Sequence, residues 1–407
     1  GSGGGGSALD LKRLNQIGIT LKKFRRPFGE VLDAALGCDE SVFTAAEDVL
    51  RLRDCLPTDD ERARLEAGAA APAAQLSEAE RVALQMAQVP RMSERLECFA
   101  SKLNFETRAE ETRLQVRALA DAADAVVADP VVPLELATVL AIGNAMNAGS
   151  FRAGAAGFRL DVLSKLSAVK ATVEGDALTL LHFVAESVRV QLAETPDGAR
   201  DARHERALDA LERARNIGAA DVQAEVDALR RSLDAIEDEY PRHRKPYSRA
   251  DQFSAKMKAF HELARRQMGE LGAQVDAMGK ALRAAGAYLA GDEASTEAEA
   301  AEALQELHAF CVSLRKATND NERRRRMREK FQAAAKAVKP ARAAGGRAQA
   351  ADAAAALPSV HGPGVARQIW STMQRGDFEQ LKRTEQAGSP GRAERPITTA
   401  SGSGAET

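Results

Sequence analysis

Hydrophobic residues recur at helical spacing along most of the chain, and two stretches follow the alternating three- and four-residue spacing of a coiled coil. These stretches cover residues 222–240 and 253–282, with charged residues at most other positions. Two prolines between them indicate a turn, because proline cannot continue a helix. We therefore predict two long helices packed antiparallel as a hairpin. The first seam is Val222, Val226, Leu229, Leu233, Ile236 and Tyr240; the second is Phe253, Met257, Phe260, Ala264, Met268, Leu271, Val275, Met278 and Leu282.

Shorter amphipathic stretches predict further helices. Residues 98–128 form one of them, and the Asp129-Pro130 pair ends it. Residues 303–317 have the same spacing and predict another packed helix. Two capping boxes, in which a hydroxyl residue precedes a glutamate by three positions, mark helix starts at Thr58 to Glu61 and Ser77 to Glu80.

The stretch from Ala141 to Phe183 combines small and apolar residues. A break rich in Gly, Asn and Ala at residues 143–150 separates two apolar runs, and small residues let two backbones approach closely. After the break, Leu160, Leu163 and Leu166 share one helical face. The simplest interpretation is a helix-loop-helix corner inside an all-helical protein.

Composition supports the helical interpretation. Only 4% of the 407 residues are aromatic, whereas Ala, Leu, Glu and Arg are abundant. A formal net charge of −2 argues against a reader of nucleic acid. No apolar run approaches the roughly 20 residues of a membrane helix, and no secretory leader opens the chain. The four cysteines lack ligand spacing, which is typical of a reducing compartment. We predict a soluble, intracellular protein.

No pattern of an active site is present. The sequence lacks a phosphate-binding glycine loop, a His/Cys metal spacing and a nucleophile motif. His182 stands in an apolar run, which favours a position in a core or interface. We therefore expect no cofactor, no metal and no enzymatic activity.

Five spaced motifs resemble the signature of the formin homology two domain, the actin-assembly domain of formins. Ala145 and Ala156 depart from it, since many members carry an aromatic ring there. The motifs are Gly143-Asn144-Ala145-Met146-Asn147, Gly157-Phe158-Arg159-Leu160, Leu163-Ser164-Lys165-Leu166, Lys170 and Leu180-Leu181-His182-Phe183.

The resemblance implies an all-α, elongated multi-helix core with a knob, a three-helix coiled-coil bridge, a post and a disordered tail. The expected ranges are 1–8, flexible linker; 9–97, knob; 98–129, coiled-coil helix; 130–194, post; 195–335, long coiled-coil helices and a basic C-terminal helix; 336–363, low-complexity tether; 364–384, autoregulatory or actin-monomer-binding helix; and 385–407, disordered tail.

The resemblance also suggests contact residues. Ile17 and Leu21 share one helical face and Ile19 lies roughly opposite, so Ile19 is either a contact residue or buried elsewhere. By resemblance, Ile19 matches the knob isoleucine that inserts into actin. Lys170 matches a post lysine that contacts actin, and is otherwise an ordinary solvated lysine. The resemblance further implies actin contacts by Lys12 and Arg13, and a surface that receives a partner's lasso from Gly143, Asn144, Met146, Asn147, Gly157 and Phe158.

Two C-terminal segments carry further hypotheses. The charged run at residues 319–328 indicates a solvated helix, or a basic face for acidic actin or a membrane. Residues 364–384 resemble the diaphanous autoregulatory segment of formins, and their end resembles an actin-monomer motif. Arg367 departs from that pattern, and an isolated amphipathic helix is the alternative. The residues concerned are Val365, Ile369, Trp370, Met373, Gly376, Phe378, Lys382 and Arg383.

The resemblance implies a cytoplasmic protein of the actin cytoskeleton that nucleates filaments and follows their barbed ends as a head-to-tail dimer. Its expected partners are actin, a second copy and an N-terminal inhibitory domain, with no nucleic acid and no integral membrane. The alternative is a helical scaffold without assembly activity. Because nothing like the Trp-bearing lasso precedes Asp10, a monomer that binds or caps actin weakly is a further expectation.

Overall fold

The computed structural model describes residues 8–69, 76–151, 153–170, 178–290 and 296–342, with side chains of the last helix described as far as residue 334. Regular elements in these ranges are all helical, and their single β feature is an isolated bridge between Lys170 and Thr179. The predicted all-α class is therefore confirmed. The chain divides into two compact units, Gly1–Asp129 with Ala199–His308 and Pro130–Gly198 with Ala309–Thr407. We call them unit 1 and unit 2 and treat each separately.

Unit 1 begins with five short helices. Both predicted capping boxes are present, because Thr58 and Glu61 exchange hydrogen bonds and so do Ser77 and Glu80. The predicted linker included Ala8, but Ala8 N donates to Glu80 Oε1 at 2.7 Å, and residues 1–7 lie outside the described residues. The helices are α1 Leu11–Phe24, α2 Phe28–Leu36, α3 Ala46–Arg53, α4 Asp59–Ala69 and α5 Glu78–Gln88.

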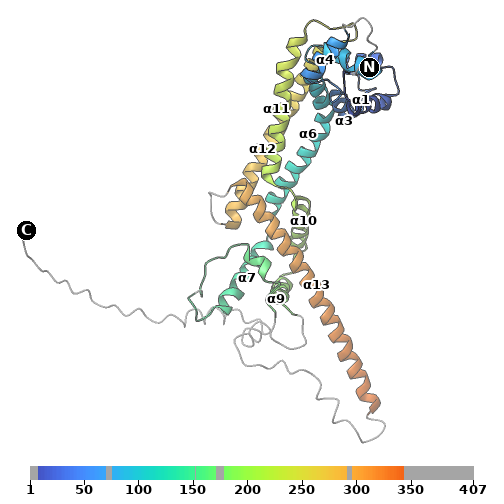
Figure 1. The fold of residues 1–407 in the computed structure, drawn as a ribbon. Coiled ribbons are helices and arrows are strands. Elements are labelled where there is room, and N and C mark those ends of the chain that lie inside the picture. Colours follow the sequence, from blue (N-terminus) through green and yellow to red (C-terminus); the bar gives the residue numbers. More distant parts are fainter. Residues whose placement is uncertain (1–7, 70–75, 152, 171–177, 291–295, 343–407) are drawn as a thin grey trace, which may run out of the picture. The chain divides into compact units, whose positions relative to one another are not determined.

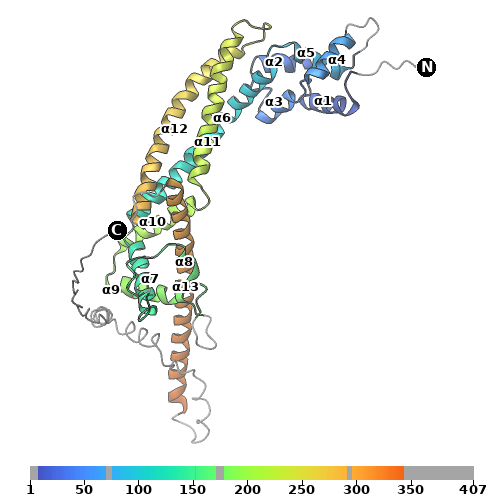
Figure 2. The same ribbon diagram turned by 60° about the vertical axis from the view of Figure 1, so that its left-hand side comes forward.

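Three long helices of unit 1 lie side by side (Figures 1 and 2). The two predicted seams lie on α11 and α12, which pack against each other and against α6. All seam residues are buried except Tyr240 and Phe260, which are half-buried. The predicted helical hairpin is thus confirmed. The helices are α6 Met92–Val127, α11 Ala219–Glu239 and α12 Phe253–Ala290, and the 3-10 helix η1 Tyr240–His243 follows α11.

Two helices are longer than the sequence indicated. Helix α6 begins at Met92 rather than Cys98, because Met92, Leu96 and Phe99 are already buried on one helical face. Helix α13 runs from Glu297 to Arg342 as one helix, where the sequence predicted a packed helix at 303–317, a solvated basic helix after it and a tether from residue 336. No glycine or proline occurs between residues 297 and 339, so nothing in the chain stops it. The remaining helix, α10, is Gly198–Ala214.

A buried ionic cluster fastens the turn after α11 to the start of α6. Arg95 Nη1 donates to Asp251 Oδ2 at 3.0 Å, and Arg95 Nη2 lies 2.8 Å from His243 Nδ1. Because a guanidinium only donates, His243 Nδ1 accepts, so His243 Nε2 donates to Glu239 Oε1 at 2.6 Å. Arg91 closes the cluster with a hydrogen bond of 2.8 Å from Nε to Glu239 Oε1. We call these five residues the Arg95 cluster.

The Arg95 cluster makes stability depend on pH through Glu239. Burial raises the pKa of the Glu239 carboxyl, but hydrogen bonds from Arg91 and His243 outweigh burial, so the pKa lies below its ordinary value. A carboxyl with a depressed folded-state pKa stabilises the protein above its unfolded-state pKa. This stabilisation is lost as the pH falls through the folded-state pKa.

We expect the free energy of unfolding to decrease as the pH is lowered from about 5 to about 3. Glu239→Gln removes the charge at similar side-chain size, and is expected to lower stability at neutral pH and to flatten this pH dependence. Urea unfolding at a series of pH values measures both effects. Glu262→Gln, on an exposed position of α12, is the matched control. If both variants retained the wild-type pH dependence, Glu239 would not be its source.

Unit 2 contains α7, α8, α9 and the part of α13 after His308. Helices α7 and α9 pack together, and Gln191 Nε2 donates to Thr138 Oγ1 at 3.2 Å between them. The sequence placed a break from residue 143, whereas α7 continues through Met146 and the Gly143 carbonyl still accepts from Asn147 N at 3.0 Å. The break therefore begins at Asn147. The helices are α7 Val132–Met146, α8 Val162–Lys165 and α9 Leu180–Glu194.

All four cysteines are buried free thiols. Burial raises the pKa of Cys38 and of Cys98 to about 12, and it also raises the pKa of Cys55. The thiolate is the nucleophilic form, so these groups are both covered and held protonated. They act as small apolar side chains of the core.

Within the described residues, no single helix is both long and apolar enough to cross a membrane. The consecutive helices α6 and α7 meet that criterion only when taken together. The same part of the chain holds no group of three or more His, Cys, Asp or Glu side chains arranged to bind a metal ion.

Candidate partner-binding sites

Helix α1 presents a buried and an exposed face. Asp10 caps the helix, since its carboxylate accepts from Arg13 N at 2.7 Å. Ile17 is fully buried, whereas Ile19 is 72% exposed, which confirms the predicted orientation and shows that the described residues do not bury Ile19. Leu11 lies eight residues before Ile19, on the same face, and is 74% exposed. Burial of Ile17 thus holds two large apolar side chains in solvent.

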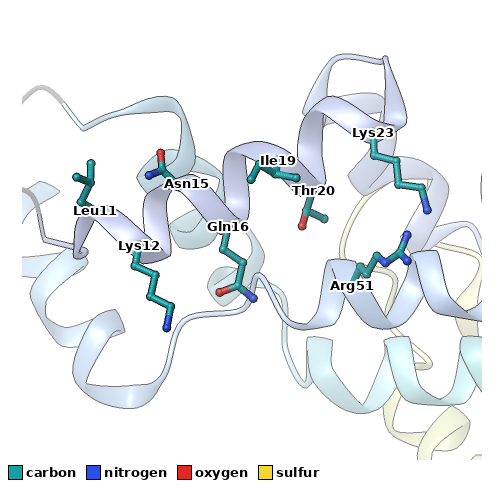
Figure 3. Close-up of a pocket in the computed structure, with 8 residues that line it drawn as sticks. All are labelled: Leu11, Lys12, Asn15, Gln16, Ile19, Thr20, Lys23 and Arg51. Carbon is teal, nitrogen blue, oxygen red and sulfur yellow. The ribbon is translucent and has the colours of Figure 1, made fainter.

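A shallow groove of about 1000 Å³ follows α1 (Figure 3). In the close-up, Leu11, Asn15 and Ile19 project to one side of the helix, and Lys12 and Gln16 project to the other. Helix α3 supplies the remaining wall. We call this depression the α1 groove; its lining residues are Leu11, Lys12, Asn15, Gln16, Ile19, Thr20, Lys23 and Arg51.

The two basic residues expected to contact actin are placed differently. Lys12 is exposed on the α1 groove. Arg13 instead donates from Nη1 to the Asp54 carbonyl at 2.7 Å and from Nη2 to the Leu56 carbonyl at 2.5 Å. Its Nε also lies 3.4 Å from a Glu61 oxygen. This geometry gives Arg13 the role of fastening α1 to the segment between α3 and α4, so its guanidinium is not presented to a partner.

At the C-terminal end of α1, one carboxylate links α1 to α3 beside the α1 groove. Asp48 pairs with Lys23 of α1 and lies 3.4 Å from Arg51 Nη1 of α3. The groove is therefore lined by three cationic side chains, Lys12, Lys23 and Arg51, and the last two share Asp48. Such an arrangement suits a partner surface that is acidic around an apolar pocket.

In unit 2, Asn144 holds the loop that follows α7. Its Oδ1 accepts from Ala155 N at 2.8 Å, and its Nδ2 donates to Ala155 O at 2.9 Å. Both halves of the side-chain amide thus pair with one residue across the loop. We call residues 144–151 and 153–158 the Asn144 loop.

The Asn144 loop exposes two large apolar side chains. Gly149 and Gly154 have φ angles of +82° and +71°, in the left-handed region that favours glycine. Met146 is 54% exposed and Phe151 is 92% exposed. Of the other residues expected on the lasso-receiving surface, Asn147 and Gly157 are exposed and Phe158 is half-buried. The loop therefore presents an apolar surface on a backbone that its glycines and Asn144 define.

Lys170 is exposed next to the start of α9. It pairs with Thr179 in the isolated bridge, and Leu180 N donates to the Val169 carbonyl at 2.8 Å. Thr179 caps α9, since its N donates to His182 Nδ1 at 3.1 Å. The position of Lys170 is thus set by backbone pairing, while residues 171–177 lie outside the described residues.

Helix α13 supports this corner. Asn321 Nδ2 donates to the His182 carbonyl at 2.7 Å, and Arg325 Nη2 donates to Glu186 Oε2 at 2.9 Å. Burial and the nearby Arg324 charge lower the pKa of His182, so its imidazole is neutral at neutral pH. His182 is therefore a packed structural residue, as its apolar sequence context predicted.

Sequence reasoning missed three exposed residues of these sites. Leu11 shares the face of Ile19, and its spacing of eight residues was a usable signal. Arg51 reaches the α1 groove only through the packing of α3, which no local pattern reveals. Phe151 was visible as an aromatic residue directly after the break rich in Gly, Asn and Ala. The autoregulatory-like residues from Val365 to Arg383 lie outside the described residues.

A comparison with known protein families shows which family this chain belongs to. The Formin Homology 2 Domain matches residues 6–315. The chain belongs to the formin family. This confirms the resemblance read from the five motifs, and the all-helical fold agrees with it. Formin homology two domains are actin-binding modules without enzymatic activity, in agreement with the prediction of a non-enzymatic protein.

Several plant formins are similar to this chain. Formin-like protein 6 of Oryza sativa subsp. japonica is 29% identical over 231 residues, which are 57% of this chain and 16% of that protein. Formin-like protein 5 of the same plant is 25% identical over 351 residues, 86% of this chain and 20% of that protein. Formin-like protein 16 of Arabidopsis thaliana is 27% identical over 231 residues, 57% of this chain and 31% of that protein. The chain thus spans well under half the length of each of these formins.

Proposed function

We propose that this chain nucleates actin filaments and stays at the growing barbed end while subunits add. Membership of the formin family supports actin as the partner. The exposed Ile19 in the α1 groove is the observation that carries the proposal. An isoleucine that is 72% exposed on an ordered helix is unfavourable in water. Insertion into an apolar cleft of actin removes that surface from solvent.

The α1 groove supplies a second component of recognition. Leu11 extends the apolar surface of Ile19, and Lys12 lies beside it. We propose that Lys12 pairs with acidic groups around the cleft that receives Ile19, while Arg13 positions α1. Lys170 is proposed as a separate actin contact of unit 2, where a flexible ammonium faces an acidic surface.

The proposed assembly is a head-to-tail dimer. We propose that the Asn144 loop receives a segment of a second copy, because Met146 and Phe151 offer exposed apolar surface on a defined backbone. Gly143, Asn147, Gly157 and Phe158 shape this surface. The protein is proposed to act in the cytoplasm on the actin cytoskeleton. The segment from Val365 to Arg383 is proposed to bind an inhibitory domain or actin monomers.

Fluorescence of pyrene-labelled actin tests the proposal directly. Filament assembly is expected to accelerate with increasing concentration of the chain, and sedimentation equilibrium is expected to give a dimer. Assembly curves that match actin alone, from a chain with a normal helical circular-dichroism spectrum, would instead assign a scaffold role. Filament capping without nucleation, from a chain that sediments as a monomer, would also contradict the proposal.

A further inference from the structure

The C-terminal part of α13 extends past the helices it packs against. Asn321 and Arg325 form its last described contacts with α9, and every residue from 326 to 334 is exposed. In both ribbon views this end of α13, drawn in orange, continues beyond α9 with no other described helix of unit 2 beside it (Figures 1 and 2). A long exposed helix in this position has surface available for a partner.

Two large apolar residues form a stripe on this exposed helix. Met327 is 52% exposed and Phe331 is 70% exposed, and their spacing of four places them on one face. The contacts to α9 come from residues before Met327, through Asp320, Asn321 and Arg325. The described side chains of unit 2 therefore leave this apolar stripe uncovered.

Basic residues border the apolar stripe on both sides. Arg324 and Arg328 follow one border, and Arg323 and Lys330 follow the other, since each lies three or four residues from Met327 or Phe331. We call Met327, Phe331 and these four residues the basic stripe. No ion pair to Arg328 or Lys330 occurs within the described residues.

Two acidic residues in this part of the helix lie away from the basic stripe, whereas Asp320 lies on its line two turns before Met327 and pairs with Arg323. Glu322 and Glu329 are seven residues apart, and Glu329 is two positions from both Met327 and Phe331, which places the two glutamates on the far face. Arg326 pairs with Glu322 on that side. From residue 322 to residue 334, cations thus flank the apolar residues and the two carboxylates face the other way.

We propose that the basic stripe docks α13 on an anionic lipid bilayer. Basic side chains around a small apolar centre suit a surface that has negative headgroups above an apolar layer. Guanidinium groups stay at the headgroups while Phe331 and Met327 enter the acyl boundary. An acidic protein surface accounts for the cations but offers no continuous apolar layer for the exposed phenylalanine. Docking is peripheral and independent of the α1 groove, so its failure leaves the proposed actin activity untouched.

Co-sedimentation of the full chain with vesicles tests the proposal. We expect binding to phosphatidylcholine vesicles that contain about 30% phosphatidylserine, little binding to phosphatidylcholine alone, and weakening by added salt. Arg328→Glu with Lys330→Glu should weaken vesicle binding at least about tenfold. Phe331→Ser should weaken it by roughly threefold or more, because one apolar side chain no longer enters the bilayer. Helical content is expected to stay unchanged, since these positions are exposed.

Arg231→Glu with Arg266→Glu is the matched control, because it makes the same change in charge at exposed positions of α11 and α12. The control is expected to bind vesicles like the wild type. Failure of the wild type to bind anionic vesicles would overturn the proposal, as would an equal loss in the control variant. Co-sedimentation with actin filaments separates the other partner class. If the α13 variant lost filament binding but kept vesicle binding, the basic stripe would be an actin contact and the proposal would be wrong.

Discussion

Ile19→Ala is expected to return pyrene-actin assembly to the rate of actin alone while leaving the stability of the chain unchanged. Ile19 is 72% exposed and contributes little to the core, so its removal costs the folded state little. Apolar anchors that fill a partner's pocket typically contribute 2 kcal/mol or more to binding, so affinity should fall at least about 30-fold. The effect should be larger than that of Lys12→Ala, because Lys12 is a solvated charge at the groove's edge.

Leu263→Ala is the matched control for Ile19. Leu263 is an apolar residue on helix α12, 55% exposed, outside the α1 groove. It should assemble filaments at the wild-type rate. Equal activity of Ile19→Ala and the wild type would show that exposure of Ile19 has no role in recognition. A melting temperature lowered by Ile19→Ala would show instead that Ile19 stabilises the folded chain.

Arg95→Met is expected to lower the free energy of unfolding by about 3–5 kcal/mol, because it leaves buried charges without their partner. The side chains of Arg95 and Asp251 are 4% and 2% exposed, so solvent does not replace the lost contact. His243 Nδ1 also loses the donor that sets its tautomer. Urea unfolding followed by circular dichroism measures the change.

Two further variants sharpen this test. Arg265→Met removes an exposed pair with Glu237, in which the side chains are 61% and 43% exposed, and should cost less than about 1 kcal/mol. Arg95→Met with Asp251→Leu should recover only part of the loss, because Asp251 also accepts from the backbone N of Tyr247 and Phe253. A full recovery would mean that those two hydrogen bonds add nothing. Similar losses from Arg95→Met and Arg265→Met would contradict the role of burial.

The coiled-coil hairpin was predictable because its signal is local and repeated. Each seam residue is three or four positions from the next, so periodicity alone identifies the buried face. The same logic located Ile19, since burial of Ile17 turns the residue two positions later outward. Periodicity did not reveal that α13 is one helix, because the apolar spacing ends near residue 317 and the charged run after it was predicted as a separate solvated helix.

The clusters that hold these helices were not predictable. Arg95 meets Asp251 across 156 residues of chain, and nothing near Arg95 in the sequence indicates burial of a charge. Arg13 was expected from the family resemblance to contact actin, yet two carbonyls between α3 and α4 bind its guanidinium. The pairing of Asn144 with Ala155 likewise depends on how the intervening loop closes. Each case rests on a tertiary contact, whereas sequence patterns report mainly local spacing.

The buried thiols make the chain suitable for site-specific labelling. Cys38, Cys55, Cys98 and Cys311 are covered in the folded state, and burial keeps the first three protonated. A maleimide dye needs an accessible thiolate, so the native protein should react slowly with it. A cysteine introduced at Phe151 would then carry the dye alone, without removal of any native cysteine. Fluorescence from that position would report directly whether a second chain covers the Asn144 loop.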